Sequence, residues 1–179
     1  MSNSELGGLL NRIAELLEIK GENRFKVIAY QKASQVVAGH PVNLHDIFDE
    51  KGAGGLMEIP GIGKGISEKM EEYYRTGKIS YLDGLSKELP AGLADMLSVQ
   101  GMGPKKVKFL YEKLKIRSLD DLEKAAREGK IRGLAGMGEK TEENILKGIQ
   151  LLKSGRERMK LGYARPIAVQ IVSELLKSG

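Results

Sequence analysis

The apolar residues of this chain recur at steps of three and four positions, and alternation of apolar with polar residues never persists. Such steps place side chains on one face of an α-helix, so the pattern predicts an all-α protein. Two long helices are expected first, separated near Gly21, with Asn23 capping the second. Their apolar stripes are Leu9, Leu10, Ile13, Leu16 and Leu17, and then Phe25, Ile28, Ala29, Ala33, Val36 and Val37.

Shorter helical stripes fill the rest of the chain, and turn-forming residues follow them. We expect the glycine-rich run Lys51–Gly55 to be a flexible connection, and the segment Leu161–Leu176 to be helical. Pro90 breaks the helical pattern where the charge changes sign. Residues 1–90 hold 11 Lys and Arg against 13 Asp and Glu, whereas residues 91–179 hold 18 against 11. The chain is therefore expected to form two small helical domains, 1–90 and 91–179.

One short pattern occurs three times, in Ile59–Lys64, Val99–Lys105 and Leu134–Lys140: an apolar residue, any residue, glycine, an apolar residue, glycine, and then polar or basic residues. Glycine permits positive φ and the close approach of a partner, while the apolar residue between the glycines packs inward. The N–H groups that follow belong to a helix N-terminus, where they bind phosphate oxygens. The repeat therefore predicts phosphate contacts by Gly61, Gly63, Lys64, Gly101, Gly103, Lys105, Lys106, Gly136, Gly138 and Lys140.

The repeat has two other interpretations, as plain helix connectors and as a nucleotide-binding loop. Glycine-capped turns also connect helices that bind no ligand. Three copies of the pattern favour this purely structural interpretation less than a single copy would. The segment Gly133–Thr141 looks like a phosphate-binding P-loop, but Glu139 stands where that motif requires lysine, and no strand precedes it. ATP and GTP binding are therefore excluded.

The three hairpins resemble helix-hairpin-helix motifs, and with their flanking segments they resemble the amino-terminal region of the family X DNA polymerases, the DNA polymerase beta group. The segments that carry the resemblance are Ile13–Asn23, Phe25–Ala33, Ile59–Lys69, Thr76–Gly77 and Gly101–Lys105. The resemblance implies an 8-kDa helical domain at the 5′-phosphate side of a DNA gap, followed by a helical DNA-binding subdomain. It implies a natural protein that is a DNA-directed DNA polymerase, whose catalytic palm is missing from this chain.

By the same resemblance, Lys69 stands where lyase members of the family place the lysine that forms a Schiff base with a 5′-deoxyribose phosphate, and Lys26 and Tyr30 stand at supporting positions. An amine that attacks the sugar aldehyde gives an imine, which eases elimination of the phosphate. Two features oppose this activity. Glu68, Glu71 and Glu72 favour the charged amine, and Met57 and Gly65 stand where lyase members tend to carry lysines.

The resemblance also implies a monovalent cation, Na⁺ or K⁺, bound by backbone carbonyls of Met57, Ile59 and Ile62, and of Leu97, Val99 and Met102. No cofactor is expected to be required for DNA binding. The adjacent pair Asp120-Asp121 follows Ser118 and predicts the first turn of a helix rather than a two-metal site. We therefore expect Mg²⁺ to act only in the polymerase domain that this chain lacks.

The composition narrows the function classes further. Cysteine is absent, which excludes disulfides, thiolate metal sites and a cysteine nucleophile. The net charge of +5 favours binding to polyanions such as nucleic acids. No apolar run approaches the length of a membrane span, so we expect no membrane partner. We also expect the protein to be a monomer and to act in the cytoplasm, at the nucleoid.

Three hypotheses remain. The first is sequence-independent binding of gapped or nicked DNA through its phosphates, as part of a family X repair polymerase. The second is a deoxyribose-phosphate lyase acting through Lys69, and the third is a helix-hairpin-helix scaffold that binds protein partners.

Overall fold

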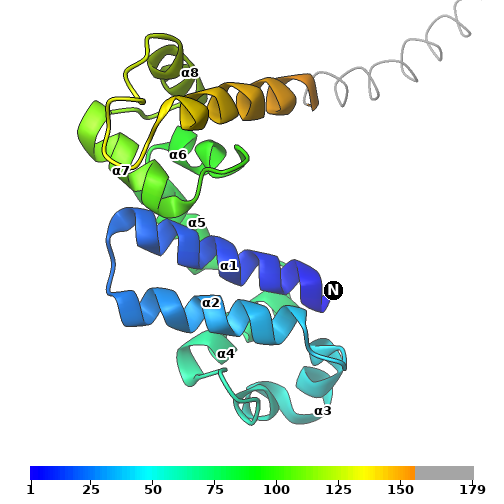
Figure 1. Ribbon diagram of the computed structural model, residues 1–179. Coiled ribbons are helices and arrows are strands. Elements are labelled where there is room, and N and C mark those ends of the chain that lie inside the picture. The colour runs from blue at the N-terminus through cyan, green and yellow to red at the C-terminus, as the bar shows by residue number, and fades with distance from the viewer. Residues whose placement is uncertain (156–179) are drawn as a thin grey trace, which may run out of the picture. The chain divides into compact units, whose positions relative to one another are not determined.

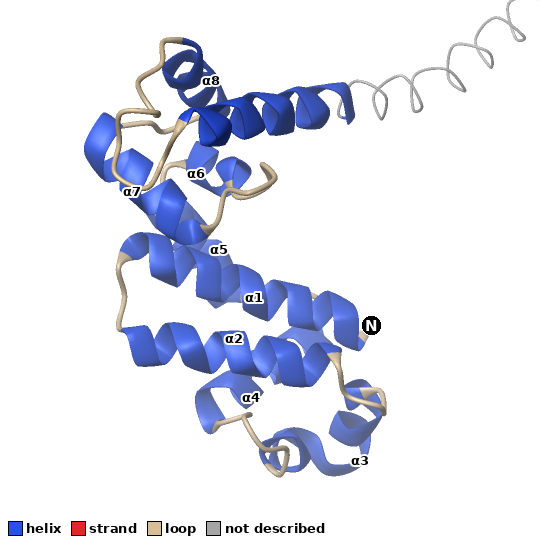
Figure 2. Ribbon diagram, in the orientation of Figure 1, coloured by secondary structure: helices blue, strands red, loops and turns tan. Residues whose placement is uncertain are grey.

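The computed structural model describes residues 1–155, and in that range it contains helices and no strand, which confirms the all-α prediction (Figure 2). The helices are α1 (Asn3–Lys20), α2 (Arg24–Ala38), α3 (Leu44–Met57), α4 (Lys64–Thr76), α5 (Ser80–Glu88), α6 (Ala91–Met96), α7 (Pro104–Leu114) and α8 (Leu119–Arg127). A further helical segment covers 139–155. The helix expected over Leu161–Leu176 lies outside the described residues.

The connection between α1 and α2 forms where local chemistry predicts it. Gly21 takes a φ of +82°, and its N–H donates to the carbonyls of Glu18 and Leu17, which closes α1. The Asn23 side chain then accepts a hydrogen bond of 2.8 Å from the N–H of Phe25 and caps α2. The two helices consequently run side by side in opposite directions (Figure 1).

The buried face of α2 differs from the predicted stripe. Phe25 is 83% exposed and Ala29 is also exposed, whereas Tyr30 and Ser34 are buried with Val27, Ala33 and Val37. Ser34 can be buried because its hydroxyl donates a hydrogen bond of 2.8 Å to the carbonyl of Gly7 on α1. The predicted stripe was right at Ala33 and Val37 and wrong at Phe25 and Ala29, and it could not foresee the buried polar contact between the helices.

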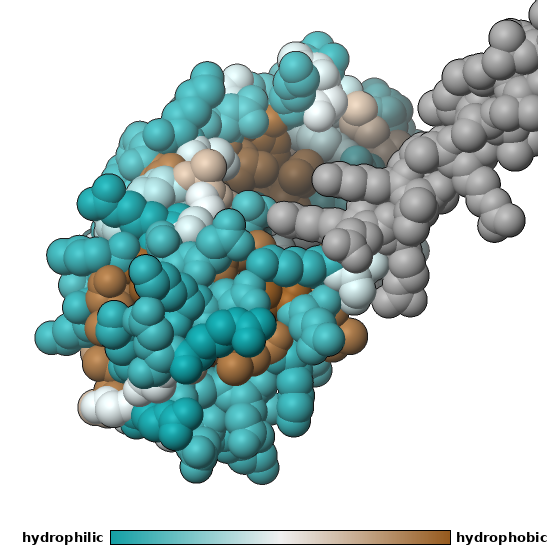
Figure 3. Space-filling model, turned by 90° about the horizontal axis from the view of Figure 1, so that it is seen from above, coloured by the Kyte–Doolittle hydropathy of each residue, from teal (hydrophilic) through white to brown (hydrophobic). Residues whose placement is uncertain are grey.

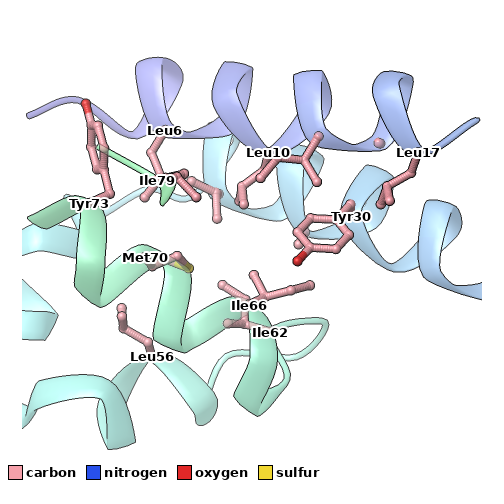
Figure 4. Packing of buried hydrophobic residues seen from close by; sticks show 14 of the residues in the cluster. Leu6, Leu10, Leu17, Tyr30, Leu56, Ile62, Ile66, Met70, Tyr73 and Ile79 are labelled. Atoms are coloured by element: carbon pink, nitrogen blue, oxygen red, sulfur yellow. The ribbon is translucent and has the colours of Figure 1, made fainter. Parts of the chain in front are cut away.

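One hydrophobic core joins α1 and α2 to α4 (Figure 4). Leu6, Leu10 and Leu17 point from α1 toward the side chains beneath them, and Tyr30 enters the same layer from α2. Ile66 and Met70 supply the opposite side from α4. This core fixes the turn that precedes α4, because Ile62 in that turn is only 4% exposed.

The run Lys51–Gly55 is not the flexible connection that its glycines predict. It belongs to α3, which is interrupted only at Gly52, where φ is 62° and ψ is −160°. Gly55 is buried and packs on the side chains of Lys51 and Ile47. The helix resumes after one residue, and the close packing at Gly55 leaves no room for a side chain there.

The described chain forms two compact units, of which one comprises Met1–Leu97 and Gly103–Ser118. The other comprises Ser98–Met102 and the chain from Leu119 onward. In the second unit, Gly148 of the segment 139–155 lies against the second hairpin, since a methyl group at Gly148 would be 2.8 Å from Cγ1 of Val99. The two units are defined by contacts within the folded chain and do not test which segments fold independently. The predicted domains 1–90 and 91–179 therefore stay a prediction.

The contact between α1 and α2 predicts that Gly7→Ala destabilises the protein. A methyl group at Gly7 would lie 2.8 Å from Cβ of Ala38 and 3.0 Å from the carbonyl oxygen of Ser34. We expect the free energy of unfolding to fall by about 1–3 kcal/mol, the usual cost of overpacking, in urea unfolding measurements.

Gly8→Ala is the matched control, because Gly8 is the next residue of the same helix and a methyl group there meets nothing within 4 Å. It should raise the free energy of unfolding by up to about 1 kcal/mol through helix propensity. Equal effects of the two substitutions would contradict the close packing.

Candidate nucleic-acid interface

The three glycine hairpins adopt the same turn. The N–H of Ile62 donates to the carbonyl of Ile59 at 3.0 Å, and the pairs Met102–Val99 and Met137–Leu134 repeat this bond at 2.9 and 3.0 Å. In each turn the first glycine has positive φ: +96° at Gly61, +81° at Gly101 and +75° at Gly136. This is the arrangement of a type II turn, in which the third residue favours glycine.

The apolar residue between the two glycines is buried in every copy, as predicted. Ile62 and Met102 are each 4% exposed and Met137 is 5% exposed, whereas the glycines on either side are exposed. Only the first glycine of each pair uses positive φ. Each turn is therefore anchored by one inward side chain and presents its backbone to solvent.

The second glycine of the first two hairpins begins a helix. Gly63 caps α4 with φ −87° and ψ 169°, and Gly103 caps α7 with nearly the same angles, −89° and 167°. No side chain caps either helix, and a methyl group at Gly63, Gly65 or Gly103 would meet nothing within 4 Å. The N–H groups of Lys64 and Gly65 in α4 are thus open to a ligand, and so is that of Lys105 in α7, whose first residue, Pro104, has no N–H. Lys64 and Lys105 are exposed in the same turns.

The third hairpin has different electrostatics. Glu139 follows its second glycine, Gly138, and the Arg132 guanidinium lies 3.1 Å from Oε1 of Glu139 and 2.6 Å from Oε2 of Glu142. Lys140 is exposed beside these carboxylates. Because Glu139 stands at the helix N-terminus, it competes with an incoming anion for the same N–H groups. This hairpin is the least suited of the three to phosphate.

Glu142 organises the chain that leads into the third hairpin. Its side chain is almost completely buried and accepts hydrogen bonds from the N–H groups of Ile131 and Arg132, at 2.9 and 2.8 Å. Burial raises the pKa of this carboxyl, but the hydrogen bonds from Arg132 and Ile131 outweigh burial and lower its pKa below the ordinary value. No local sequence pattern marks Glu142, because its partners lie ten and eleven residues away along the chain.

The candidate lyase residues come together in the first unit, although they belong to different helices. The Lys69 amine on α4 donates a hydrogen bond of 2.9 Å to the carbonyl of Gly65 and lies 5.0 Å from the centre of the Tyr81 ring on α5. Lys26 on α2 lies 5.1 Å from the same ring, and Tyr30 stacks on it at 6.2 Å. Burial raises the pKa of Tyr30, so its phenol stays protonated.

Two of the carboxylates near Lys69 in the sequence, Glu71 and Glu72, are engaged elsewhere. Glu71 accepts a hydrogen bond of 2.9 Å from Arg75, and Glu72 accepts hydrogen bonds from the backbone N–H and the hydroxyl of Ser80. These bonds from Ser80, and to a smaller extent the charge of Lys69, lower the pKa of Glu72. No carboxylate forms an ion pair with Lys69 in the described part of the chain.

The place of Tyr81 beside both lysines could not be predicted from the sequence. Tyr81 holds both lysines by cation–π contact, yet it lies 12 residues beyond Lys69 on another helix. No local pattern marks such a contact. Only the packing of α5 onto the core brings the ring to the lysines.

The predicted cation ligands are backbone carbonyls in the turns. The carbonyls of Ile59 and Val99 each accept one N–H within the turn, and each oxygen has a second lone pair available. Carbonyl oxygens are ligands that hard cations such as Na⁺ and K⁺ prefer. A cation at these carbonyls stays a prediction. Within residues 1–155, no cluster of His, Asp and Glu side chains suits a metal ion.

The face drawn in Figure 3 is mostly hydrophilic, with hydrophobic residues in separate patches. No helix in the described range is both long and apolar enough to cross a membrane.

Two helix-hairpin-helix regions, each with this turn geometry, define the class of protein. Residues 1–79 match the family described as helix-hairpin-helix domain, and residues 93–150 match the family described as SAM-like helix-hairpin-helix tandem. The second match spans the hairpins at Gly101 and Gly136, and the first includes the hairpin at Gly61.

Two curated relatives refine this classification. The chain is 37% identical over 175 residues to the DNA polymerase/3'-5' exonuclease PolX of Bacillus subtilis (strain 168), which covers 98% of this chain and 30% of that protein. It is 27% identical over 121 residues to DNA polymerase lambda of Arabidopsis thaliana, which covers 67% of this chain and 21% of that protein. The chain thus spans less than a third of the length of either relative.

Over 98% of its length the chain is thus similar to a family X DNA polymerase, and its two matched regions are helix-hairpin-helix domains. This confirms the resemblance drawn from the sequence.

The buried contacts of Glu142 predict a pH-dependent stability. Because folding lowers the pKa of this carboxyl, its stabilisation is present above the unfolded-state pKa and is lost as the pH falls through the lower, folded-state pKa. Glu142→Gln should lower the free energy of unfolding at neutral pH by about 1–3 kcal/mol. It should also remove this part of the acid sensitivity in urea unfolding measured as a function of pH.

Glu143→Gln serves as the control, since Glu143 is the exposed neighbour on the same helical segment. It should leave both the stability and its pH dependence almost unchanged. An equal acid sensitivity in the Glu142→Gln protein and the native protein would assign no such role to Glu142.

Proposed function

We propose that this chain binds DNA through its phosphate groups, without reading the base sequence. The observation that carries the proposal is the pair of uncapped helix N-termini at Gly63 and Gly103, each with an exposed lysine in the first turn. Backbone N–H groups and lysine amines bind phosphate oxygens, which are the same at every base. The related Bacillus and Arabidopsis proteins are named as DNA polymerases, which supports DNA as the partner.

Gapped or nicked duplex is the form of DNA that we propose as the preferred partner. Two hairpins of equal geometry, in different parts of the chain, offer two phosphate sites for two strand segments. A break in one strand lets the duplex bend at little cost, so that both sites can be filled together. The chain acts, in this proposal, as the DNA-holding part of a repair polymerase and works as a monomer.

A deoxyribose-phosphate lyase is the second candidate function, supported by the cluster of Lys69, Lys26, Tyr30 and Tyr81. The neutral Lys69 amine would add to the sugar aldehyde and release water to form an imine. Loss of a proton from the adjacent carbon would then expel the phosphate at the next carbon. Lys26, on the same ring, is suited to bind the 5′-phosphate of this substrate.

DNA binding predicts a strong dependence on salt. Because phosphate contacts release counterions, the affinity for gapped duplex should fall roughly tenfold or more between about 50 and 200 mM salt, measured by fluorescence anisotropy. Lys64→Glu combined with Lys105→Glu should weaken binding further and reduce the salt dependence. A protein-binding scaffold would instead show no salt-dependent affinity for DNA.

Lys87→Glu is the charge-matched control, because Lys87 is exposed on α5 and lies outside all three hairpins. Its effect on affinity should be smaller than that of either hairpin lysine alone. If Lys87→Glu weakens binding as much as Lys64→Glu, general attraction by positive charge explains the affinity.

The lyase candidate predicts covalent trapping. Incubation with an incised abasic duplex and borohydride should give a protein–DNA adduct, detected by gel electrophoresis, which Lys69→Ala and Lys69→Arg both lose. Arginine keeps the charge and cannot form the imine. Unchanged adduct in Lys69→Ala would exclude Lys69 as the nucleophile, and binding without any adduct would leave DNA holding as the function.

A further inference from the structure

The first compact unit contains a cleft of about 480 Å³ that shares only Lys105 with the sites described above. Its lining comes from the turn between α1 and α2, from the first half of α2 and from α7. Its lining includes Gly21, Arg24, Val27, Gln31, Lys105 and Lys108. The volume is within the usual range for small-molecule sites.

Positive charge converges on this cleft from two helices that are distant in the sequence. Arg24 begins α2, and Lys105 and Lys108 lie in the first half of α7. Arg24 and Lys105 have no ion-pair partner among residues 1–155. Lys108 extends across the turn, since a methyl group at Gly21 would lie 2.7 Å from its Nζ.

Two carboxylates also line the cleft, and they limit where an anion can bind. Glu22 is held by Lys20, with 3.4 Å between Oε1 and Nζ, while Glu18 adds a second negative charge at the end of α1. A phosphate group therefore fits beside the unpaired Arg24 and Lys105, and not beside the end of α1.

The remaining lining offers an apolar surface with one amide. Val27 is 5% exposed, Ile28 is partly exposed, and the Gln31 side chain lies one helical turn further along α2. A nucleotide has this composition: a phosphate, a sugar and a flat base whose edge forms hydrogen bonds. A base in a duplex is stacked and paired, so only an unpaired nucleotide can enter such a cleft.

We propose that this cleft holds one unpaired nucleotide of the bound DNA, with its phosphate at Arg24 and Lys105 and its base against Val27 and Ile28. The proposal rests on the DNA binding proposed above and adds to it a site that detects the missing nucleotide of a gap. Because Lys105 also follows Gly103, the same strand can contact the N-terminus of α7 and then enter the cleft. The Gln31 amide carries both a hydrogen-bond donor and an acceptor, so by rotating it can bond to the edge of any base.

The test compares affinities for two DNA duplexes of the same sequence, one with a single-nucleotide gap and one with a nick. Arg24→Glu should weaken binding to the gapped duplex about tenfold more than binding to the nicked duplex, the loss expected for one charge-assisted contact. Gln31→Trp, which fills the cleft without a change of charge, should cause the same selective loss. Unchanged helical circular dichroism and thermal midpoint would show that both variants are folded.

Lys32→Glu is the matched control, because Lys32 is an exposed cation on α2 that does not line the cleft. It should affect both duplexes equally and weakly. If Arg24→Glu weakens both duplexes equally, or if Gln31→Trp leaves the gapped complex unchanged, the nucleotide site is refuted while DNA binding stands. If the native chain binds neither duplex, the proposed function fails, and this site fails with it.

Discussion

The hairpins depend on one constraint: the apolar residue between two glycines must be buried while the backbone on both sides stays at the surface. The three hairpins satisfy this constraint in the same way, by burying Ile62, Met102 and Met137. Each turn has a hydrogen bond across it and a positive φ at the glycine before the buried residue. The inward side chain sets the direction of the following helix, so that the N-termini of α4 and α7 remain open. Loss of this burial would release the turn, and with it the ordered N–H groups that suit phosphate.

The same geometry supports different chemistry in different copies. Lysines follow the first two hairpins, and the third has a carboxylate at its helix start, held by Arg132. Glu142 fixes the approach to that third hairpin from a buried position, so its role is structural. We infer that the three hairpins share one backbone framework, and that the charge of the first two residues after the second glycine decides whether the turn favours an anion.

Local features of the fold could be predicted from the sequence, and long-range ones could not. The end of α1 at Gly21 and the cap at Asn23 follow from the conformational and hydrogen-bonding preferences of single residues. The burial of Ser34 depends on a carbonyl 27 residues away, and the meeting of Lys26 and Lys69 depends on a ring from a third helix. Candidate residues can therefore be selected by pattern, whereas their grouping requires the packed structure.

The hydrogen bond between Ser34 and Gly7 has a consequence for how this sequence can diverge. The two helices approach so closely that position 7 has no room for a side chain, while the adjacent position 8 is open. Position 7 is therefore restricted to glycine in any related chain that keeps this helix spacing, whatever its ligand. If related chains carry other residues at position 8 but only glycine at position 7, selection acts on the distance between the two helices. Selection for helix formation alone would act equally on both positions.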